Sequence, residues 1–343
     1  MTKARALAAL CLATVAAAAQ AETYVVFDVP GTVFSLQVVA LNGTGAVAGS
    51  YTDAINVSHG FVRSPGGTIT RFDVPGAPAG TFPAGMNANG VIAGYYWVTS
   101  FNPQGFIRAA DGSVTTYNVP GSFWTQIRAI NDNGDVAGTY TPNISPVAFP
   151  TGFLQSATGL ATFGLSGDSL SVYAMNNLDA TAGVADVQGF VRTADGTRTI
   201  FDVPKGTVGL TEVTPTGIND HGSVAGYAQQ VVCGGPEGTT CIQLQGRSFV
   251  RGINGAMHVF RMPQSYKHGT YALAINSDGT TTGHYYIQDT KVAHGFIREG
   301  NGRQTPFDVP GMTHTYPTAI NDSGVIAGRC VDDAGTHAFI RLP

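Results

Sequence analysis

The sequence is poor in the residue patterns from which most catalytic and metal sites are recognised. Only 12% of its 343 residues are charged, and it has four cysteines and two tryptophans. No Ser/His/Asp elbow, glycine-rich phosphate loop or His-x-His pattern stands out. The sequence also lacks an obvious acidic pair of the kind that glycosidases use, because Asp53, Asp186 and Asp289 are scattered. We therefore predict no metal and no cofactor.

Helical periodicity and long apolar runs are absent outside the N-terminus. Lys3 and Arg5 precede a mostly apolar run over 6–19, and Ala19-Gln20-Ala21 fits a cleavage site, so 1–21 is predicted to be a secretory signal peptide. The run is too short to favour a membrane span. Cleavage lowers Lys+Arg from 18 to 16 against 22 Asp+Glu, about −6 net. A secreted or periplasmic protein is predicted, with no nucleic acid as partner.

Glycine is abundant, with 45 residues, and a motif of roughly 45 residues occurs seven times, which is typical of a radial repeat array. The Phe-Asp-Val-Pro element begins at Phe27, Phe72, Tyr117, Phe163, Phe201, Phe260 and Phe307. The Ile-Asn element is centred on Asn42, Asn87, Asn131, Asn176, Asn219, Asn276 and Asn321. The Gly-Phe-Ile-Arg element has its Phe at Phe61, Phe106, Phe153, Phe190, Phe249, Phe296 and Phe339.

Each copy is predicted to form four short strands. The first ends at the Ile-Asn, and the others are exemplified by residues 136–140, 105–108 and 115–119. Tight turns rich in Asn, Asp and Gly join the first strand to the second and the third to the fourth. In an antiparallel meander these turns lie at one end, here called the turn face. The loops of variable length lie at the other end, here called the variable face.

The two ends of the chain predict how the array closes. The last copy stops after its third strand, at residues 339–343, whereas the mature chain begins with a spare fourth strand at residues 24–30. Pairing of the two would complete a ring and remove an exposed sheet edge. A linear solenoid would need capping repeats, which neither end provides. The prediction is an all-β monomer in which 22–343 form one seven-bladed β-propeller of four-stranded blades.

Three cysteines follow the signal peptide. Cys233 and Cys241 flank a Gly-rich insertion in a variable loop of the fifth copy, where an oxidising compartment favours a local disulfide. Zinc is a poor alternative, because no further ligands have suitable spacing nearby. Cys330 replaces a second-strand Tyr and is predicted to be a buried free thiol.

The repeated Ile-Asn-Asp-x-Gly-x-Val-Ala-Gly and His-Gly-Phe-Ile-Arg segments resemble the bacterial extracellular HAF-repeat family. The His-Ala-Phe triplet that gives the family its name stands at His337-Ala338-Phe339, with variants at His59 and His294. The resemblance covers essentially the whole mature chain. It implies a secreted or surface location and carries no catalytic residues.

Residues that recur from copy to copy are predicted to be scaffold. The Asp of Asp132, Asp220 and Asp322 could bind calcium, but a turn residue bonded to its own backbone is favoured. The His of His59, His294 and His337 is predicted to be a polar cap of the third strand rather than a ligand. A structural ion pair or hydrogen bond is predicted for the recurrent Arg at Arg63, Arg108, Arg192, Arg251, Arg298 and Arg341.

Departures from the repeat on the variable face are better site candidates. His268 and His314 precede first strands of the last two copies, and His284 and Tyr286 end a second strand. Arg329 occupies the corresponding region one copy later. A base, an acid and a cation are what proton abstraction beside a carboxylate requires. The alternative is that these are ordinary polar loop residues with some aromatic packing.

Two further departures are expected to face the axis. Arg128 and Tyr173 lie in first strands where other copies carry small or aliphatic residues. Arg128 either binds an anionic group in the channel or pairs with a neighbouring blade. Trp97 and Trp124 lie in or near loops of the variable face, where they either stack on sugar rings or pack loop against loop.

The sequence thus predicts a secreted propeller that binds an extracellular ligand, with carbohydrate favoured, through its variable face. The rival hypothesis is a polysaccharide lyase or hydrolase that uses the His/Tyr/Arg cluster over the last two blades. Convergence of those side chains at the mouth of the channel would favour the enzyme, and burial by loop packing would favour the binding protein.

Overall fold

The computed structural model describes residues 22–99, 102–143, 149–164, 169–204, 210–234, 240–287 and 290–343, without the side chains of 210–211, 230–245 and 266–268. That part of the chain consists of strands joined by turns and loops. It contains no helix that could cross a bilayer. The predicted signal peptide, 1–21, lies outside the described residues.

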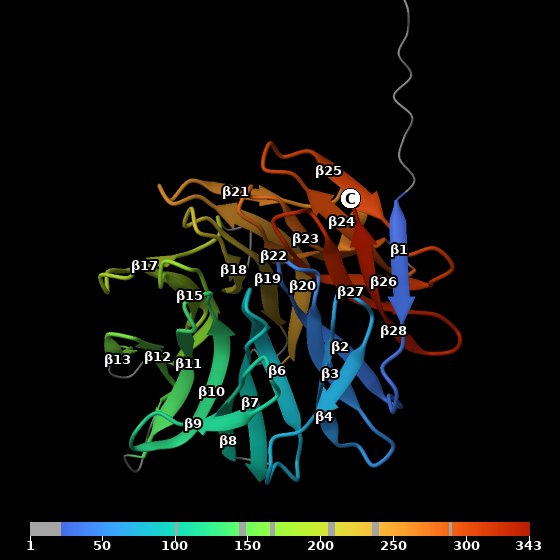
Figure 1. Cartoon of the computed structure of the whole chain (residues 1–343). Helices are drawn as coiled ribbons and strands as arrows, with labels where there is room; N and C mark the ends of the chain where they lie inside the picture. The colour runs from blue at the N-terminus through green and yellow to red at the C-terminus, as the bar shows by residue number, and fades with distance from the viewer. Residues whose placement is uncertain are drawn as a thin grey trace, which may run out of the picture.

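Seven four-stranded antiparallel sheets surround a central axis, which confirms the predicted propeller (Figure 1). Each blade runs from an innermost first strand to an outermost fourth strand. The blades, in chain order, are β2 (Ser35–Leu41), β3 (Val47–Thr52), β4 (Ser58–Arg63) and β5 (Ile69–Phe72); β6 (Thr81–Met86), β7 (Ile92–Thr99), β8 (Asn102–Arg108) and β9 (Val114–Tyr117); β10 (Ser122–Ile130), β11 (Val136–Pro142), β12 (Thr151–Ser156) and β13 (Gly159–Phe163); β14 (Leu170–Met175), β15 (Thr181–Ala185), β16 (Gln188–Arg192) and β17 (Arg198–Phe201); β18 (Leu210–Ile218), β19 (Val224–Gly234), β20 (Thr240–Arg251) and β21 (Met257–Phe260); β22 (Ser265–Ile275), β23 (Thr281–Ile287), β24 (Ala293–Arg298) and β25 (Gln304–Phe307); and β26 (His314–Ile320), β27 (Ile326–Val331), β28 (Thr336–Leu342) and β1 (Thr23–Phe27).

The ring closes through the N-terminal strand, as predicted. Strand β1 lies beside β28 (Figure 1) and pairs with it antiparallel, with Val26 opposite Phe339. The guanidinium of Arg341 reinforces the closure by donating to the carboxylate of Glu22 at 2.6 Å. The last blade therefore contains strands from both ends of the chain.

Aromatic and cationic side chains join each blade to the next. The third-strand Phe is fully buried in all seven blades. Between blades one and two, the rings of Phe72 and Phe106 meet edge to face at 6.1 Å, and the guanidinium of Arg108 stacks on Phe72 at 4.9 Å. The recurrent Arg is structural, as predicted, but it acts mainly through cation–π stacking on the preceding blade. Of these recurrent arginines, only Arg341 also forms an ion pair with a described residue.

In the third blade both partners of this contact between blades are replaced together. Gln155 stands where the other copies have Arg, and Tyr117 of the preceding blade stands where they have Phe. The Tyr117 hydroxyl donates to Oε1 of Gln155 at 3.2 Å. A hydrogen bond thus replaces the cation–π contact at the same junction, which explains two departures from the repeat without invoking a ligand.

A closed belt of asparagines encircles the axis at the turn face. Nδ2 of each Ile-Asn asparagine donates to the backbone carbonyl of the corresponding asparagine in the next blade, and Asn321 closes the belt by donating to Asn42 at 3.1 Å. The side-chain oxygen meanwhile accepts backbone N–H groups of its own turn. Because these side chains are buried, the belt satisfies polar groups that water does not reach.

The Asp that follows the Ile-Asn asparagine was predicted to bond to the backbone of its own turn, and this prediction was wrong. Asp132 does not bond to its own turn, because its Oδ1 accepts the N–H of Ala88 in the preceding blade at 2.7 Å. The same contact joins Asp220 to Asn177 and Asp322 to Ser277. These carboxylates therefore link blades.

The recurrent His of the third strand pairs with the Asp that directly follows the fourth strand. Nδ1 of His59 lies 2.9 Å from a carboxylate oxygen of Asp73, and His294 pairs in the same way with Asp308. His337 pairs with Asp28 across the ring closure. These contacts agree with the predicted strand cap.

A bulge in every first strand directs one residue toward the axis. In blade three the register of β10 and β11 shifts between Ile127 and Ala129, which leaves Arg128 as the extra residue. The seven bulged residues are Val39, Ala84, Arg128, Tyr173, Thr216, Leu273 and Thr318. All seven line an axial cavity of about 230 Å³, so Arg128 and Tyr173 lie where they were expected.

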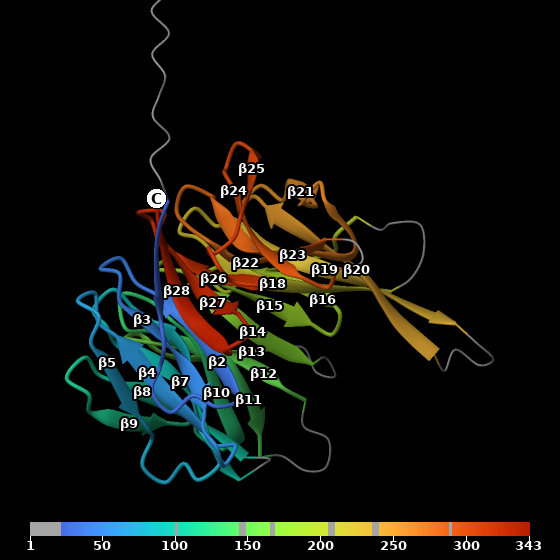
Figure 2. The ribbon, with the colours of Figure 1, turned by 90° about the vertical axis from the view of Figure 1, so that its right-hand side faces the viewer.

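The fifth blade departs from the others in one long hairpin. Strands β19 and β20 project beyond the body of the ring (Figure 2). Their register places Cys233 opposite Cys241. The side chains of both lie outside the described residues, so the disulfide stays a prediction. Cys330 is a buried free thiol, as predicted, and burial raises its pKa to about 12.

Candidate functional site

One rung of the ladder between first and second strands carries large side chains in some blades only. Its first-strand residue stands two positions before the bulged residue. Its second-strand residue directly follows the Gly of the repeated Val-Ala-Gly segment, as Thr139 follows Gly138. Since first strands begin at the variable face, this rung lies on that side of the axial cavity. It holds Gln37–Ser50, Phe82–Tyr95, Gln126–Thr139, Ser171–Val184, Thr214–Tyr227, Tyr271–His284 and Tyr316–Arg329 in blades one to seven.

The end of the axial cavity at the variable face is called the mouth. Residues of the last three blades form one side of it, called the histidine wall. His284 is at its centre. Its ring stacks on Tyr271 at 5.2 Å and meets the edges of Tyr286 at 5.4 Å and Tyr316 at 5.1 Å. Tyr271 in turn contacts Tyr227 of blade five at 5.2 Å. The members of the wall are Tyr227, Tyr271, His284, Tyr286, His314, Tyr316 and Arg329.

Tyr316 connects His284 to the remaining members of the wall. The guanidinium of Arg329 lies 4.0 Å from the centre of the Tyr316 ring, and the ring of His314 stacks on Tyr316 at 5.9 Å. Nδ1 of His314 accepts the backbone N–H of Ala293 at 3.1 Å, which fixes the proton of a neutral ring on the other nitrogen. The cation and the two imidazoles thus gather around one phenol ring.

The electrostatics of this wall favour a neutral imidazole between protonated phenols. Burial, followed by the charge of Arg329, lowers the pKa of His284 to about 4. Burial and the neighbouring Tyr316 raise the pKa of Tyr286 to about 12. Nδ1 of His284 is buried without a hydrogen-bond partner among the described residues. Near neutral pH the wall therefore holds an unprotonated imidazole beside a protonated phenol and a guanidinium.

The opposite side of the mouth is formed by blades two and three and is called the tryptophan wall. Tyr95 stacks on Phe82 at 5.3 Å and meets the edge of Trp97 at 6.2 Å. The guanidinium of Arg128 lies over the Tyr95 ring, 5.0 Å from its centre, and donates to Oε1 of Gln126 at 2.7 Å. Arg128 thus reaches from the axial cavity to the neighbouring blade. The members of the wall are Phe82, Tyr95, Trp97 and Arg128.

The structure brings together most of the residues nominated from the sequence. Those on the histidine wall are His284, His314, Tyr286 and Arg329, and those on the tryptophan wall are Trp97 and Arg128. Tyr173 stands at the axial cavity with 38% of its surface exposed. Trp124 is half-buried on β10, and no ring contact involves it within the described residues. The side chain of His268 lies outside the described residues.

Sequence reasoning missed Tyr271 as a member of the site and placed His314 in a loop, whereas it begins β26. The signal for Tyr271 was present. Its repeat position carries Gln37, Gln126 and Ser171 in other blades, so an aromatic residue there is as much a departure as His284. Aromatic residues are common in strands, which concealed it.

The titration of His284 yields a testable difference in acid stability. An unfolded His titrates near 6.5, so between that pH and about 4 the unfolded chain binds a proton that the folded site does not. His284 therefore destabilises the fold as pH falls through this window. We expect His284→Phe to lose less of its thermal midpoint between pH 7 and about pH 4.5 than the wild type, measured by calorimetry. Equal losses in both proteins would contradict the assignment.

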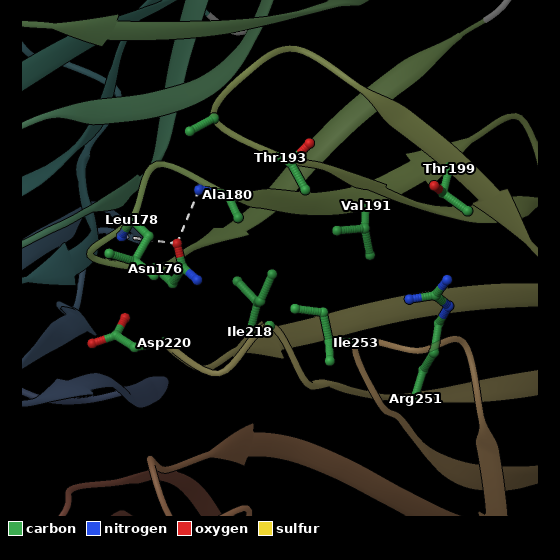
Figure 3. Close-up of a pocket in the computed structure, with 12 residues that line it drawn as sticks. Asn176, Leu178, Ala180, Val191, Thr193, Thr199, Ile218, Asp220, Arg251 and Ile253 are labelled. Atoms are coloured by element: carbon green, nitrogen blue, oxygen red, sulfur yellow. Dashed lines mark hydrogen bonds between the residues drawn. The ribbon is translucent and has the colours of Figure 1, made fainter.

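A second cavity, of about 290 Å³, lies between blades four and five on the turn face. Figure 3 shows apolar side chains of both blades facing each other across it, with Val191 on one side and Ile218 and Ile253 on the other. Arg251, at its edge, already stacks on Phe201 and donates to a backbone carbonyl at 3.3 Å. The cavity offers few free polar groups to orient a ligand. The mouth is therefore the better candidate site.

Within the described residues no group of three or more His, Cys, Asp or Glu side chains is arranged to hold a metal ion. The mouth presents two guanidinium groups and the ring nitrogens of two imidazoles. The arrangement can bind an anionic group and move a proton.

No protein-family model matches the sequence, and no curated protein matches it. Solved structures do match. A catalytically inactive virginiamycin B lyase from Staphylococcus aureus with quinupristin aligns over 94% of this chain and 100% of its own, with a TM-score of 0.60 and 12% identity. A streptogramin B lyase aligns over 93% and 97%, with a TM-score of 0.57 and 12% identity. The polysaccharide lyase Uly1 aligns over 87% and 88%, with a TM-score of 0.48 and 9% identity. The two likenesses above 0.5 establish a shared propeller fold.

Proposed function

We propose that the protein acts outside the cytoplasm and binds an extracellular carbohydrate at the mouth of its propeller. The observation that carries this proposal is the gathering of ring and guanidinium side chains from blades two, three, five, six and seven around one end of the axial cavity. Aromatic rings and a few fixed polar groups are what sugar recognition uses. The rung is occupied by small or polar residues in the other blades, so the scaffold does not require them.

The contact surfaces for a sugar ring are the aromatic faces that no neighbour covers. Tyr173 exposes 38% of its surface at the axial cavity. The only ring contact of Trp97 with a described residue is an edge-to-face contact with Tyr95, at an interplanar angle of 81°. By contrast, Tyr316 has His314 and Arg329 against its ring. Sugar stacking is therefore assigned to Tyr173 and Trp97, and Tyr316 is assigned to positioning.

Calorimetric titration of the mature protein with neutral and acidic oligosaccharides tests the proposal. We expect Trp97→Ala and Tyr173→Ala each to weaken binding by about tenfold, which corresponds to the ~1.4 kcal/mol of one stacking contact. The control is Ile253→Ala, which truncates a side chain 74% exposed on the turn face. If no oligosaccharide binds the folded protein, carbohydrate binding at the mouth is rejected.

A second candidate function is elimination on an acidic polysaccharide. The specific observation in its favour is that a buried neutral imidazole, a protonated phenol and a guanidinium meet around Tyr316. From the sequence, convergence of the nominated side chains at the mouth was expected to favour an enzyme, and their burial was expected to favour a binding protein. His284, His314 and Tyr286 lie around Tyr316, which favours the enzyme, whereas the burial of Nδ1 of His284 favours the binding protein. The assay is the appearance of ultraviolet absorbance from unsaturated products of uronate polymers.

A further inference from the structure

We infer that the ligand of the mouth is a linear polyanion, a uronate-containing chain that crosses the axis and presents one carboxylate to each wall. This inference rests on the proposed function and specifies the charge, the minimum length and the orientation of its ligand. The juxtaposition behind it is a pair of guanidinium groups, each held on an aromatic ring, on opposite sides of the same opening.

Neither guanidinium has a carboxylate partner within the described residues. Arg128 donates to the neutral amide of Gln126 and lies on Tyr95. Arg329 lies on Tyr316 and makes no ion pair with a described residue. A guanidinium on a ring face is held in place by cation–π attraction while its N–H groups remain directed outward in a planar fork. That fork fits the two oxygens of a carboxylate.

The recurrent scaffold arginines show that these two differ from the rest of the protein. Arg108 and Arg298 are buried between blades, where each stacks on a Phe and donates to the carbonyl of the residue that follows it. Arg128 and Arg329 occur once each, at positions where other blades have no cation. Both are only half-buried, and Arg128 lines the axial cavity, so their charge is available to a ligand.

The ring geometry sets the span of the ligand. Arg128 belongs to blade three and Arg329 to blade seven, so blades four, five and six separate them on one side and blades one and two on the other. In a seven-membered ring this is the most nearly opposite placement. A single carboxylate can reach one cation only. Simultaneous contact therefore requires a chain with at least two acidic residues lying across the axial cavity.

The background charge of the protein makes this recognition selective. The whole chain has a formal net charge of −4, so an anion is attracted only where cations are concentrated. Burial is the main cause that raises the pKa of Tyr227, and the charge of Glu212 adds to it. Glu212 belongs to blade five, whereas the two cations belong to blades three and seven. Polyanion binding should accordingly weaken steeply with salt, because two ion pairs form in partly exposed positions.

The test is calorimetric titration at low and physiological salt with oligouronates from one to six residues, taken from polygalacturonate, alginate and hyaluronate, and with methyl-esterified oligogalacturonate. We expect affinity to appear above a threshold length, Arg128→Ala and Arg329→Ala each to lower it by about tenfold to a hundredfold, and the double variant and the methyl ester to lose it. Arg303→Ala, which removes a cation 72% exposed on the turn face, should bind as the wild type does.

The outcomes separate this inference from the function on which it rests. If the methyl ester or a neutral oligosaccharide binds as tightly as the acid, the polyanion inference is overturned and carbohydrate binding stands. If a single uronate binds as well as the longer chains, the span across the axis is overturned. If no oligosaccharide of either kind binds the folded protein, both proposals are rejected. Circular dichroism and thermal midpoints confirm that each variant is folded.

Discussion

Gly138→Ala is expected to destabilise the fold by about 3 kcal/mol or more, because a Cβ at this position would lie 2.0 Å from the backbone carbonyl oxygen of Gln126. The carbonyl carbon of Gln126 and Cα of Ile127 would each lie 3.0 Å from it. These atoms belong to the strand that carries the bulge at Arg128, so no side-chain rotation relieves the contact. The thermal midpoint should fall by roughly 6 °C or more.

A matched substitution isolates the cause of that loss. Gly43→Ala adds the same methyl group in an open turn, where nothing lies within 4 Å and the backbone conformation does not require glycine. Its thermal midpoint should stay within about 1 °C of the wild type. If both variants are equally stable, the fold does not require the first and second strands to approach so closely at Gly138. The glycine would then not explain the bulge at Arg128.

The glycine prediction bears on function as well as on stability. Every second strand has Gly at this position, and the Cβ of each would lie 1.9–2.3 Å from a first-strand carbonyl. Without a side chain there, the two strands can approach while the bulged residue turns toward the axis. The repeated glycines therefore allow Arg128 and Tyr173 to reach the axial cavity.

The fold could be predicted from the sequence because its determinants are local or repeated. The turn residues, the period and the spare strand at residues 24–30 are all visible along the chain. They predicted that this strand pairs with the last copy, and the structure shows the pairing, with Val26 opposite Phe339. The burial of Cys330 followed from its place in the repeat. A repeat also multiplies each weak signal seven times.

What the sequence did not reveal are the contacts between blades. Asp132 bonds to a residue 44 positions earlier, and the recurrent arginines stack on the previous copy. The histidine wall is of the same kind, because Tyr316 and His284 come from different blades and meet only once the ring is closed. Local turn chemistry explains no such contact, so departures from the repeat could be nominated but not paired.

Loss of elimination activity is the largest effect expected at the mouth. In the second candidate function, neutral His284 removes the proton on the carbon next to the uronate carboxylate. The electron pair forms a carbon–carbon double bond and expels the glycosidic oxygen, which takes a proton from the hydroxyl of Tyr286. Arg329 balances the charge that develops on the carboxylate. Transfer of the proton from His284 to Tyr286 through solvent then restores both groups.

His284→Gln and Tyr286→Phe should each lower the rate of unsaturated-product formation by about a hundredfold or more, the range for loss of a general base or acid. Binding of the same uronate chain should change far less, because the two arginines remain. His258→Gln, on the exposed outer strand β21, is the control and should retain full activity.

The pH dependence distinguishes this chemistry from a structural role for the same residues. Because the pKa of His284 is about 4 and that of Tyr286 about 12, both groups hold their active protonation states from mildly acidic to alkaline pH. The rate should rise through pH 4 and then level off. A folded wild type that produces no new absorbance from any uronate polymer, or a His284→Gln variant with wild-type rates, would remove elimination from consideration and leave the mouth as a binding site alone.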